Sequence, residues 1–260
     1  MKTLLKTLLR LAGYNCYRYR NRFAPWGVSL ELDLERLGWP PGKTQVILDI
    51  GANVGVWSAS ANQIFPHATI HAFEPVPKTF ATLCRNVGKM ARVRTNCLGF
   101  SSEAKSKPMQ IYSESQVNSM EDAKSEIGRL IETIIVPCTT LDAWQTSLAI
   151  EKIDLIKIDV GGHELQVLIG GVNTFREARV TFLLIEAKSI LSSEVSGPGV
   201  SLEQLSSFLS PLGYRLLVLY TDFITLSPRR PFYSNFNALF GNLTSLTLAS
   251  ATSLGASDLT

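Results

Sequence analysis

The chain has 260 residues, with 25 Lys and Arg, 22 Asp and Glu, and a formal net charge of +3. Its 45% hydrophobic and 18% charged residues are typical of a globular protein with one sizeable core. The slight net charge does not indicate a nucleic-acid partner. Its 4 cysteines form no CxxC pair, which argues against a zinc knuckle or a disulfide framework. We therefore expect the reducing cytoplasm.

The first 40 residues are predicted to form a helical, basic extension. Basic residues gather in residues 1–23, where Leu4, Leu8 and Leu11 share one face of an amphipathic helix. This helix either packs on its own domain or contacts a membrane surface peripherally. Charged residues interrupt its apolar run, which argues against a secretion signal.

Residues 41–241 are predicted to form the main domain, because strand and helix patterns alternate along them. Apolar segments predict strands at 46–50, 69–73, 93–98, 154–160, 181–187, 215–220 and 237–240, and helical patterns lie at 29–38, 56–65, 78–89, 164–170 and 201–213. This rhythm predicts an α/β fold with a mostly parallel sheet, helices on both faces and a closing pair of strands.

Two segments depart from this rhythm. Residues 100–144 read as an insertion, with strand patterns at 109–113 and 133–141 around a polar middle, and we expect it to form part of an acceptor site or to cover one. Residues 242–260 are rich in Ser, Thr, Leu and Ala with one charged residue, and we expect this tail to be disordered.

A glycine-containing turn follows the first strand in VILDIGANVG. A dinucleotide fingerprint would need glycine where the chain has Asn53 and Val56, and a Walker loop would need a lysine that is absent. What remains is a tight turn at Gly51, a left-handed backbone that Asn53 tolerates, and close approach at Gly55. This pattern indicates a small ligand without many phosphates.

An acidic residue also ends the second strand. In TIHAFEP, Glu74 lies roughly 20 residues past the loop, where a carboxylate can accept two hydrogen bonds from a ribose diol. Asp49 and Glu74 end neighbouring strands, so their side chains are expected at one edge of the sheet. Alternatively, Asp49 caps a helix and Glu74 faces solvent.

Three motifs in order, DIGANVG, AFEPVP and IDLIKIDVGGHELQVLIGG, resemble the FkbM family of S-adenosylmethionine-dependent methyltransferases. The resemblance extends from about Val46 to Glu186, with weaker similarity in NALF. It implies a Rossmann-like class I methyltransferase fold with S-adenosyl-L-methionine as cofactor. It also implies that the methionine end of the cofactor is contacted by Asp49, Gly51, Asn53 and Gly55. Glu74 is implied to hold the ribose. The resemblance is looser for the adenine, which would be bordered by Asn96, Cys97 and Leu98. The donor carries a sulfonium and an ammonium group but no phosphate, which suits a loop without lysine beside an aspartate.

A second group of polar residues follows the strand at 154–160, in KIDVGGHE. Transfer of a methyl group to a hydroxyl requires removal of a proton, and Asp159 is our first choice of base, His163 the second. Glu164 is expected to orient or charge the imidazole. Each of the three also has a structural alternative: Asp159 as a helix cap, His163 as a solvent-facing residue and Glu164 as a partner of the helix dipole.

The acceptor is expected to approach the backbone at Gly161 and Gly162, where no side chain fills the space. The resemblance also suggests Ser119 for this region. The family often has an acidic or amide residue at the position of Gly161, so any contact made by that side chain is in doubt here. The other histidines, His67 and His71, form no ligand cluster with the second group, and we expect no metal. The alternative is a divalent cation at Asp159, which occupies a strand end that some related catechol-type methyltransferases use for metal.

The resemblance to the FkbM family implies an O-methyltransferase that acts on a hydroxyl of a sugar, glycolipid or polyketide-like metabolite. One alternative is a cofactor-binding module of the same fold without catalysis. A nicotinamide-dependent oxidoreductase is the other, and Asn53 and Val56 disfavour it. The expected partner is a small-molecule or glycan acceptor rather than nucleic acid, and the oligomeric state is not indicated.

Overall fold

The computed structural model describes residues 25–115, 118–121, 129–188, 199–220 and 235–246. The predicted amphipathic helix in residues 1–23 and most of the predicted disordered tail lie outside this part of the chain. Within the described residues, no helix is both long enough and apolar enough to cross a bilayer.

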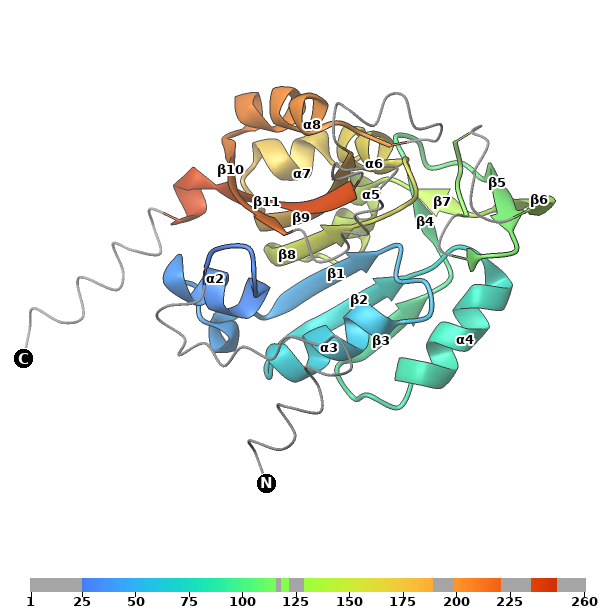
Figure 1. The fold of residues 1–260 in the computed structure, drawn as a ribbon, viewed down its shortest axis with the longest axis horizontal. Helices are drawn as coiled ribbons and strands as arrows, with labels where there is room; N and C mark the ends of the chain where they lie inside the picture. Colours follow the sequence, from blue (N-terminus) through green and yellow to red (C-terminus); the bar gives the residue numbers. More distant parts are fainter. Residues whose placement is uncertain (1–24, 116–117, 122–128, 189–198, 221–234, 247–260) are drawn as a thin grey trace, which may run out of the picture.

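A seven-stranded sheet forms the centre of the domain (Figure 1). Its strands, in the spatial order β10-β11-β9-β8-β1-β2-β3, are Tyr214–Tyr220, Asn235–Asn242, Val180–Lys188, Ile153–Ile158, Val46–Ile50, Thr69–Phe73 and Val93–Asn96. The pairs from β9 through β3 are parallel, and β11 runs antiparallel to both of its neighbours. The predicted mostly parallel sheet with a closing antiparallel strand is confirmed. That strand lies between β9 and β10 rather than at the edge of the sheet.

Helices cover both faces of this sheet (Figure 1). One face carries α2, α3 and α4, which are Leu30–Arg36, Val56–Ile64 and Pro77–Val87, and the other carries α5, α6, α7 and α8, which are Leu141–Ser147, Glu164–Ile169, Val172–Arg176 and Leu202–Leu209. Short 3-10 helices lie at Pro41–Lys43 and Ser210–Leu212. Local sequence explains several boundaries: Ser201 and Gln204 form a capping box at the start of α8, and Gly170 ends α6.

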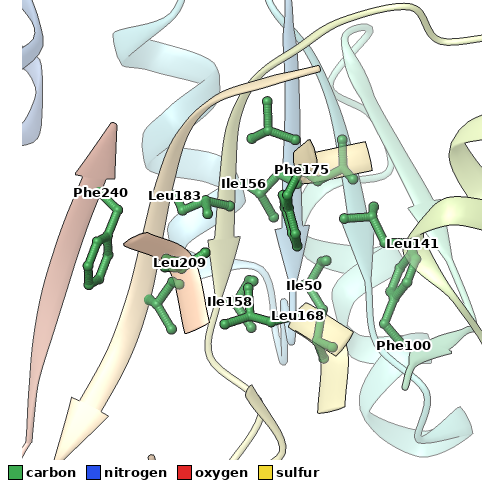
Figure 2. Close-up of a cluster of buried hydrophobic side chains, with 14 of the residues drawn as sticks. Ile50, Phe100, Leu141, Ile156, Ile158, Leu168, Phe175, Leu183, Leu209 and Phe240 are labelled. Carbon is green, nitrogen blue, oxygen red and sulfur yellow. The ribbon is translucent and has the colours of Figure 1, made fainter. Parts of the chain in front are cut away.

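Two buried clusters fill the space between the sheet and its helices. The cluster under α5–α8 includes Ile158, Leu168 and Phe175, and Figure 2 shows these side chains between the strands and the helices. The cluster under α2–α4 includes Ile47 and Leu155. Because strands β1 and β8 contribute to both clusters, they are buried on both faces. This explains why their sequences are nearly continuous apolar runs.

The strands that follow β1 in the chain are placed first on one side of it and then on the other. From β1 the chain adds β2 and then β3 on one side, and it later returns to add β8 and β9 on the other. Such a switch point leaves room for ligands beyond the carboxyl ends of the two central strands. The β1–β8 register pairs Asp49 with Lys157, so the polar residues that end both strands meet at this point.

The predicted insertion folds into two small sheets beside the carboxyl ends of the main strands (Figure 1). The antiparallel pair consists of β5, Lys107–Tyr112, and β6, Leu130–Val136, and the parallel pair of β4, Gly99–Phe100, and β7, Cys138–Thr139. The segment 133–141, predicted as one strand, is thus divided between β6, β7 and the start of α5 at Leu141. Pro137 lies at the division, because proline has no N–H to continue a ladder.

Leu168→Ala tests the packing of α6, because this side chain is fully buried in the cluster under α5–α8. We expect a loss of about 2–5 kcal/mol in the free energy of unfolding, from lost transfer energy plus the cavity. The neighbouring Ile169 is 40% exposed, so Ile169→Ala should cost about 0.5 kcal/mol or less. Urea unfolding measures both, and equal losses would contradict the assigned burial.

Candidate active site

The loop after β1 adopts the backbone that the sequence predicted. Gly51, Asn53 and Gly55 have φ angles of 83°, 48° and 88°, so the left-handed conformation expected at Asn53 is confirmed. A Cβ atom on Gly51 would lie 1.9 Å from the carbonyl oxygen of Asp159. The loop is therefore in direct backbone contact with the end of β8, and only glycine fits there.

Gly55 is the N-cap of α3 and allows a close approach of a different kind. A Cβ atom there would lie 2.7 Å from Leu83 Cδ1 and 2.9 Å from Val87 Cγ1, both on α4. This glycine lets the start of α3 pack against α4. The structure thus gives it a packing role, and contact with a cofactor stays a prediction.

Asp49 lies inside the protein. Its side chain has no exposed surface, Oδ2 accepts a hydrogen bond of 2.5 Å from Ser58 Oγ, and Oδ1 lies 3.4 Å from Lys157 Nζ. The β1–β8 register directs this carboxylate toward Lys157. Its predicted contact with the methionine end of a cofactor stays a prediction.

Lys157 connects the ends of β1 and β8. Its ammonium group lies 3.1 Å from Asp159 Oδ2 in addition to its contact with Asp49. Burial lowers the pKa of Lys157, but the attraction of Asp159 and Asp49 outweighs this effect and raises its pKa on balance. Sequence reasoning missed this residue, although a lysine inside an apolar strand buried on both faces is a signal of a buried anionic partner.

Asp159 is the accessible acid of this group. Its side chain is 44% exposed, and one carboxylate oxygen is paired with Lys157. Its backbone N–H donates to the carbonyl of Ile50. Asp159 therefore stands at the switch point, where it can meet a ligand while Lys157 fixes its position.

Glu74 joins the second motif to the glycine loop. Oε1 accepts a hydrogen bond of 2.9 Å from the Val76 N–H, and Oε2 accepts one of 3.1 Å from the Asn53 N–H. Burial raises the pKa of Glu74 to about 7, although the two hydrogen bonds oppose this shift. A carboxylate has about four acceptor positions, so two remain for a ribose diol.

Residues predicted near the adenine lie beside Glu74. The Glu74 N–H donates to the carbonyl of Asn96, the last residue of β3, and the Asn96 side chain donates to two backbone carbonyls. Cys97 is exposed, with Sγ 3.8 Å from the Pro75 carbonyl oxygen, and Leu98 packs on the core. The structure brings these residues to the edge of the sheet that Glu74 occupies.

His163 has partners at both ring nitrogens. Nδ1 lies 2.6 Å from Glu121 Oε1 and Nε2 lies 2.9 Å from Ser101 Oγ, and the residue is only 4% exposed. Burial lowers the pKa of His163, with a smaller opposing contribution from Glu121. The predicted imidazole partner was Glu164, but the residue that bonds the ring is Glu121. No motif spacing indicated Glu121, because it lies in the insertion.

Glu164 folds back on its own loop instead. Its Oε1 accepts hydrogen bonds from the N–H groups of Val160 and Gly162, at 3.0 and 3.1 Å, and the residue is 1% exposed. Burial raises the pKa of Glu164. These contacts close the loop between β8 and α6 and hold it in one conformation.

The insertion packs directly on this loop. Ser119 Oγ donates a hydrogen bond of 2.7 Å to the Gly161 carbonyl, and a Cβ atom on Gly161 would lie 2.7 Å from the Asn118 carbonyl oxygen. The space beside Gly161 is therefore occupied by the chain itself rather than open to an acceptor. Ser115 Oγ also donates to Asn53 Oδ1, at 3.1 Å, so the insertion contacts both loops of the site.

Metal-ligating side chains do not gather at this edge. Across the part of the chain that the structure describes, no group of three or more His, Cys, Asp and Glu residues is arranged to hold a metal ion.

Comparison with known proteins gives the family. The family model described as "Methyltransferase FkbM domain" matches residues 49–216. The 2-O-methyltransferase NoeI of Sinorhizobium fredii is 28% identical over 149 residues, covering 53% of this chain and 61% of that protein. The hexuronic acid methyltransferase AglP of Haloferax volcanii is 29% identical over 145 residues, which cover 54% of this chain and 55% of that protein. The 31-O-demethyl-FK506 methyltransferase FkbM of Streptomyces tacrolimicus is 30% identical over 155 residues, which cover 48% of this chain and 58% of that protein.

The fold and the switch-point site define a Rossmann-like protein of the class I methyltransferase type. The chain belongs to the FkbM methyltransferase domain family, because the family model covers more than half of it. It spans less than two thirds of the length of each of the three relatives.

S-adenosyl-L-methionine is the cofactor of this domain, and the residues present fit it. The loop 51–55 offers glycine backbone and carries no Lys or Arg, which suits a donor without phosphate. Asp159 supplies an accessible carboxylate for a cation, and Glu74 retains free acceptor positions. S-adenosylhomocysteine, the demethylated product, is therefore a suitable binding probe.

Gly51→Ala tests the contact between the loop and β8. The new methyl group would overlap the Asp159 carbonyl, so the loop must move, and we expect at least a tenfold loss of S-adenosylhomocysteine affinity in calorimetry. Gly38→Ala is the matched control, since Gly38 also has a positive φ of 75° but nothing within 4 Å. It should cost about 1–2 kcal/mol of stability and leave binding intact. Unchanged binding in Gly51→Ala would contradict the loop assignment.

Glu74→Gln tests the effect of burial on this carboxyl group. The pKa of Glu74 is raised to about 7 in the folded protein, so the protonated form contributes stability that is fully present below about pH 4.5. That contribution is lost as the pH rises through 7. Relative to the wild type, Glu74→Gln should therefore gain stability between pH 5 and pH 8, on the order of 3 kcal/mol.

Thermal melts at several pH values measure this difference. Glu203→Gln is the control, because it removes one negative charge from the exposed start of α8 and leaves the buried carboxyl group in place. A stability difference between Glu74→Gln and the wild type that does not change with pH would contradict the raised pKa.

Proposed function

We propose that this protein is an S-adenosylmethionine-dependent O-methyltransferase that acts on a hydroxyl group of a sugar, glycolipid or polyketide-like metabolite. The observation that carries the proposal is the accessible Asp159 carboxylate at the switch point, paired with a buried lysine and in backbone contact with the glycine loop. This arrangement provides an anionic group beside a loop that suits the methyl donor.

The names of the relatives support an oxygen acceptor. One is a 2-O-methyltransferase and another acts on 31-O-demethyl-FK506, while a third is a hexuronic acid methyltransferase. These proteins differ in acceptor, and this chain covers only part of each. The proposal therefore extends to the chemical class of the acceptor and not to one compound.

The residues of the site have distinct proposed roles. Gly51, Asn53 and Gly55 form the backbone cradle at the methionine end, and Glu74 accepts hydrogen bonds from the ribose diol. Asn96, Cys97 and Leu98 border the adenine, at the edge beside Glu74. When bound, S-adenosylmethionine supplies a methyl group on a positively charged sulfur.

Asp159 is the proposed base. A hydroxyl that gains a methyl group loses its proton, and the carboxylate oxygen not paired with Lys157 can accept it. His163 and Glu164 are nearly fully buried, both ring nitrogens of His163 have protein partners, and Glu164 Oε1 accepts two backbone hydrogen bonds. We therefore give them positioning roles, in which they hold the loop between β8 and α6.

The acceptor reaches this edge next to the insertion. Ser119 anchors the insertion to the Gly161 carbonyl, and Gly162 lies in the same loop with a positive φ of 100°. Because the chain fills the space at Gly161, the acceptor is proposed to lie along the exposed side of Asp159 instead.

Asp159→Ala tests the role of the base. At saturating donor, we expect turnover on a hydroxyl acceptor to fall by about 10² to 10⁴-fold, the usual contribution of a general base. A screen of sugars and polyketide-like alcohols with labelled methyl donor identifies the acceptor and gives the rate. Glu203→Gln, which changes a surface charge on α8, should keep the wild-type rate.

The result separates three cases. Wild-type turnover in Asp159→Ala would rule out the proton-accepting role. Saturable S-adenosylhomocysteine binding without turnover on any acceptor would favour a binding module without catalysis. Absence of any binding by the wild-type protein would overturn the proposed function itself.

A further inference from the structure

Three charged side chains form a line from the interior to the surface at the switch point. This line, which we call the charged row, consists of Asp49, Lys157 and Asp159. Lys157 Nζ lies 3.4 Å from Asp49 Oδ1 and 3.1 Å from Asp159 Oδ2. The exposed fractions of the three side chains are 0%, 9% and 44%, so only Asp159 reaches the surface to a substantial extent.

The charged row carries one net negative charge, because two carboxylates share a single ammonium group. Among the described residues, no other cation makes an ion pair with either carboxylate. Burying an ammonium or a carboxylate is costly unless each is paired. Lys157 contacts both carboxylates, so the row as a whole retains one uncompensated negative charge, and Asp159 is its only substantially exposed carboxylate.

The backbone of Asp159, whose side chain is the exposed end of the charged row, adjoins the glycine loop. A Cβ atom on Gly51 would lie 1.9 Å from the Asp159 carbonyl oxygen, and the Asp159 N–H donates to the carbonyl of Ile50 at the end of β1. The proposed function places the methionine end of the donor at this loop. Transfer of the methyl group removes the positive charge of the sulfur at that end of the donor.

We infer that the charged row makes the site prefer the cationic donor over S-adenosylhomocysteine, and that Lys157 is the positioning residue that holds Asp159 for this purpose. The inference rests on the proposed function and adds a basis for product release. Attraction between opposite charges is strong where water is partly excluded, and it disappears when the sulfur becomes neutral. The ammonium group of the methionine part is present in both molecules, so it does not contribute to the preference.

The first arm of the test is Asp159→Asn, which keeps the shape of the side chain and removes the charge. The dissociation constants of S-adenosylmethionine and S-adenosylhomocysteine are measured by calorimetry. We expect donor affinity to fall about tenfold or more, the size of one partly exposed charge interaction, with less than about a twofold change for the product. Equal losses for both ligands, or no loss for either, would overturn the inference.

The second arm is the double variant Asp49→Asn with Lys157→Met. It removes one negative and one positive charge, so the net charge of the row is unchanged while Asp159 loses its partner. Replacing both members of a buried pair by neutral residues often preserves stability. If Lys157 positions Asp159, the preference for donor over product should fall about threefold or more. A wild-type preference in a folded double variant would overturn the positioning role.

Asp154→Asn is the control for both arms. Asp154 lies near the opposite end of β8, where its side chain accepts hydrogen bonds from the Gln45 and Val46 N–H groups. The variant changes one charge in the same strand away from the site and should keep the wild-type preference. Urea unfolding establishes that each variant is folded at the assay temperature.

The test separates this inference from the proposed function. If the wild-type protein binds neither ligand, the proposed function fails. If the wild-type protein binds both ligands and Asp159→Asn leaves the ratio of their dissociation constants unchanged, the inference about the charged row fails, while the proposed function is not contradicted.

Discussion

The ion pair between Asp49 and Lys157 joins the two strands on which the site depends. The parallel register of β1 and β8 places these residues opposite each other, and both are almost completely buried. A buried ion pair contributes little net stability, but breaking it by removing one partner is costly. The pair therefore adds a costly-to-break side-chain contact to the β1–β8 ladder, next to the glycine loop and Asp159.

The insertion contributes a second constraint, because it contacts the loops after both strands. Ser115 bonds to Asn53 in the first loop, Ser119 bonds to Gly161 in the second, and Glu121 bonds to His163 at the start of α6. An insertion that the sequence presented as a possible cover is thus part of the support of the site. It also explains why glycine suits position 161: its φ of 62° and the Asn118 carbonyl oxygen 2.7 Å from where a Cβ would lie leave no room for a side chain.

Local sequence patterns were sufficient for much of the fold and the loop. The strand at 46–50, the helix that starts after Gly55 and the left-handed Asn53 follow from apolar runs and backbone preferences that act over a few residues. The partner of His163 could not be predicted in this way. Glu121 is 42 residues distant along the chain, and only the docking of the insertion brings the two together.

The sequence by itself determined the α/β architecture, the family and the chemical type of the loop, because periodicity and short motifs encode these locally. Tertiary structure alone decided which acidic groups are accessible. Asp49 and Asp159 both lie at strand ends in the sequence. Asp49 is nevertheless buried in contact with Ser58 and Lys157, while Asp159 is nearly half exposed. The difference arises from strand register and from helix packing over the sheet, which depend on contacts between residues far apart in the chain.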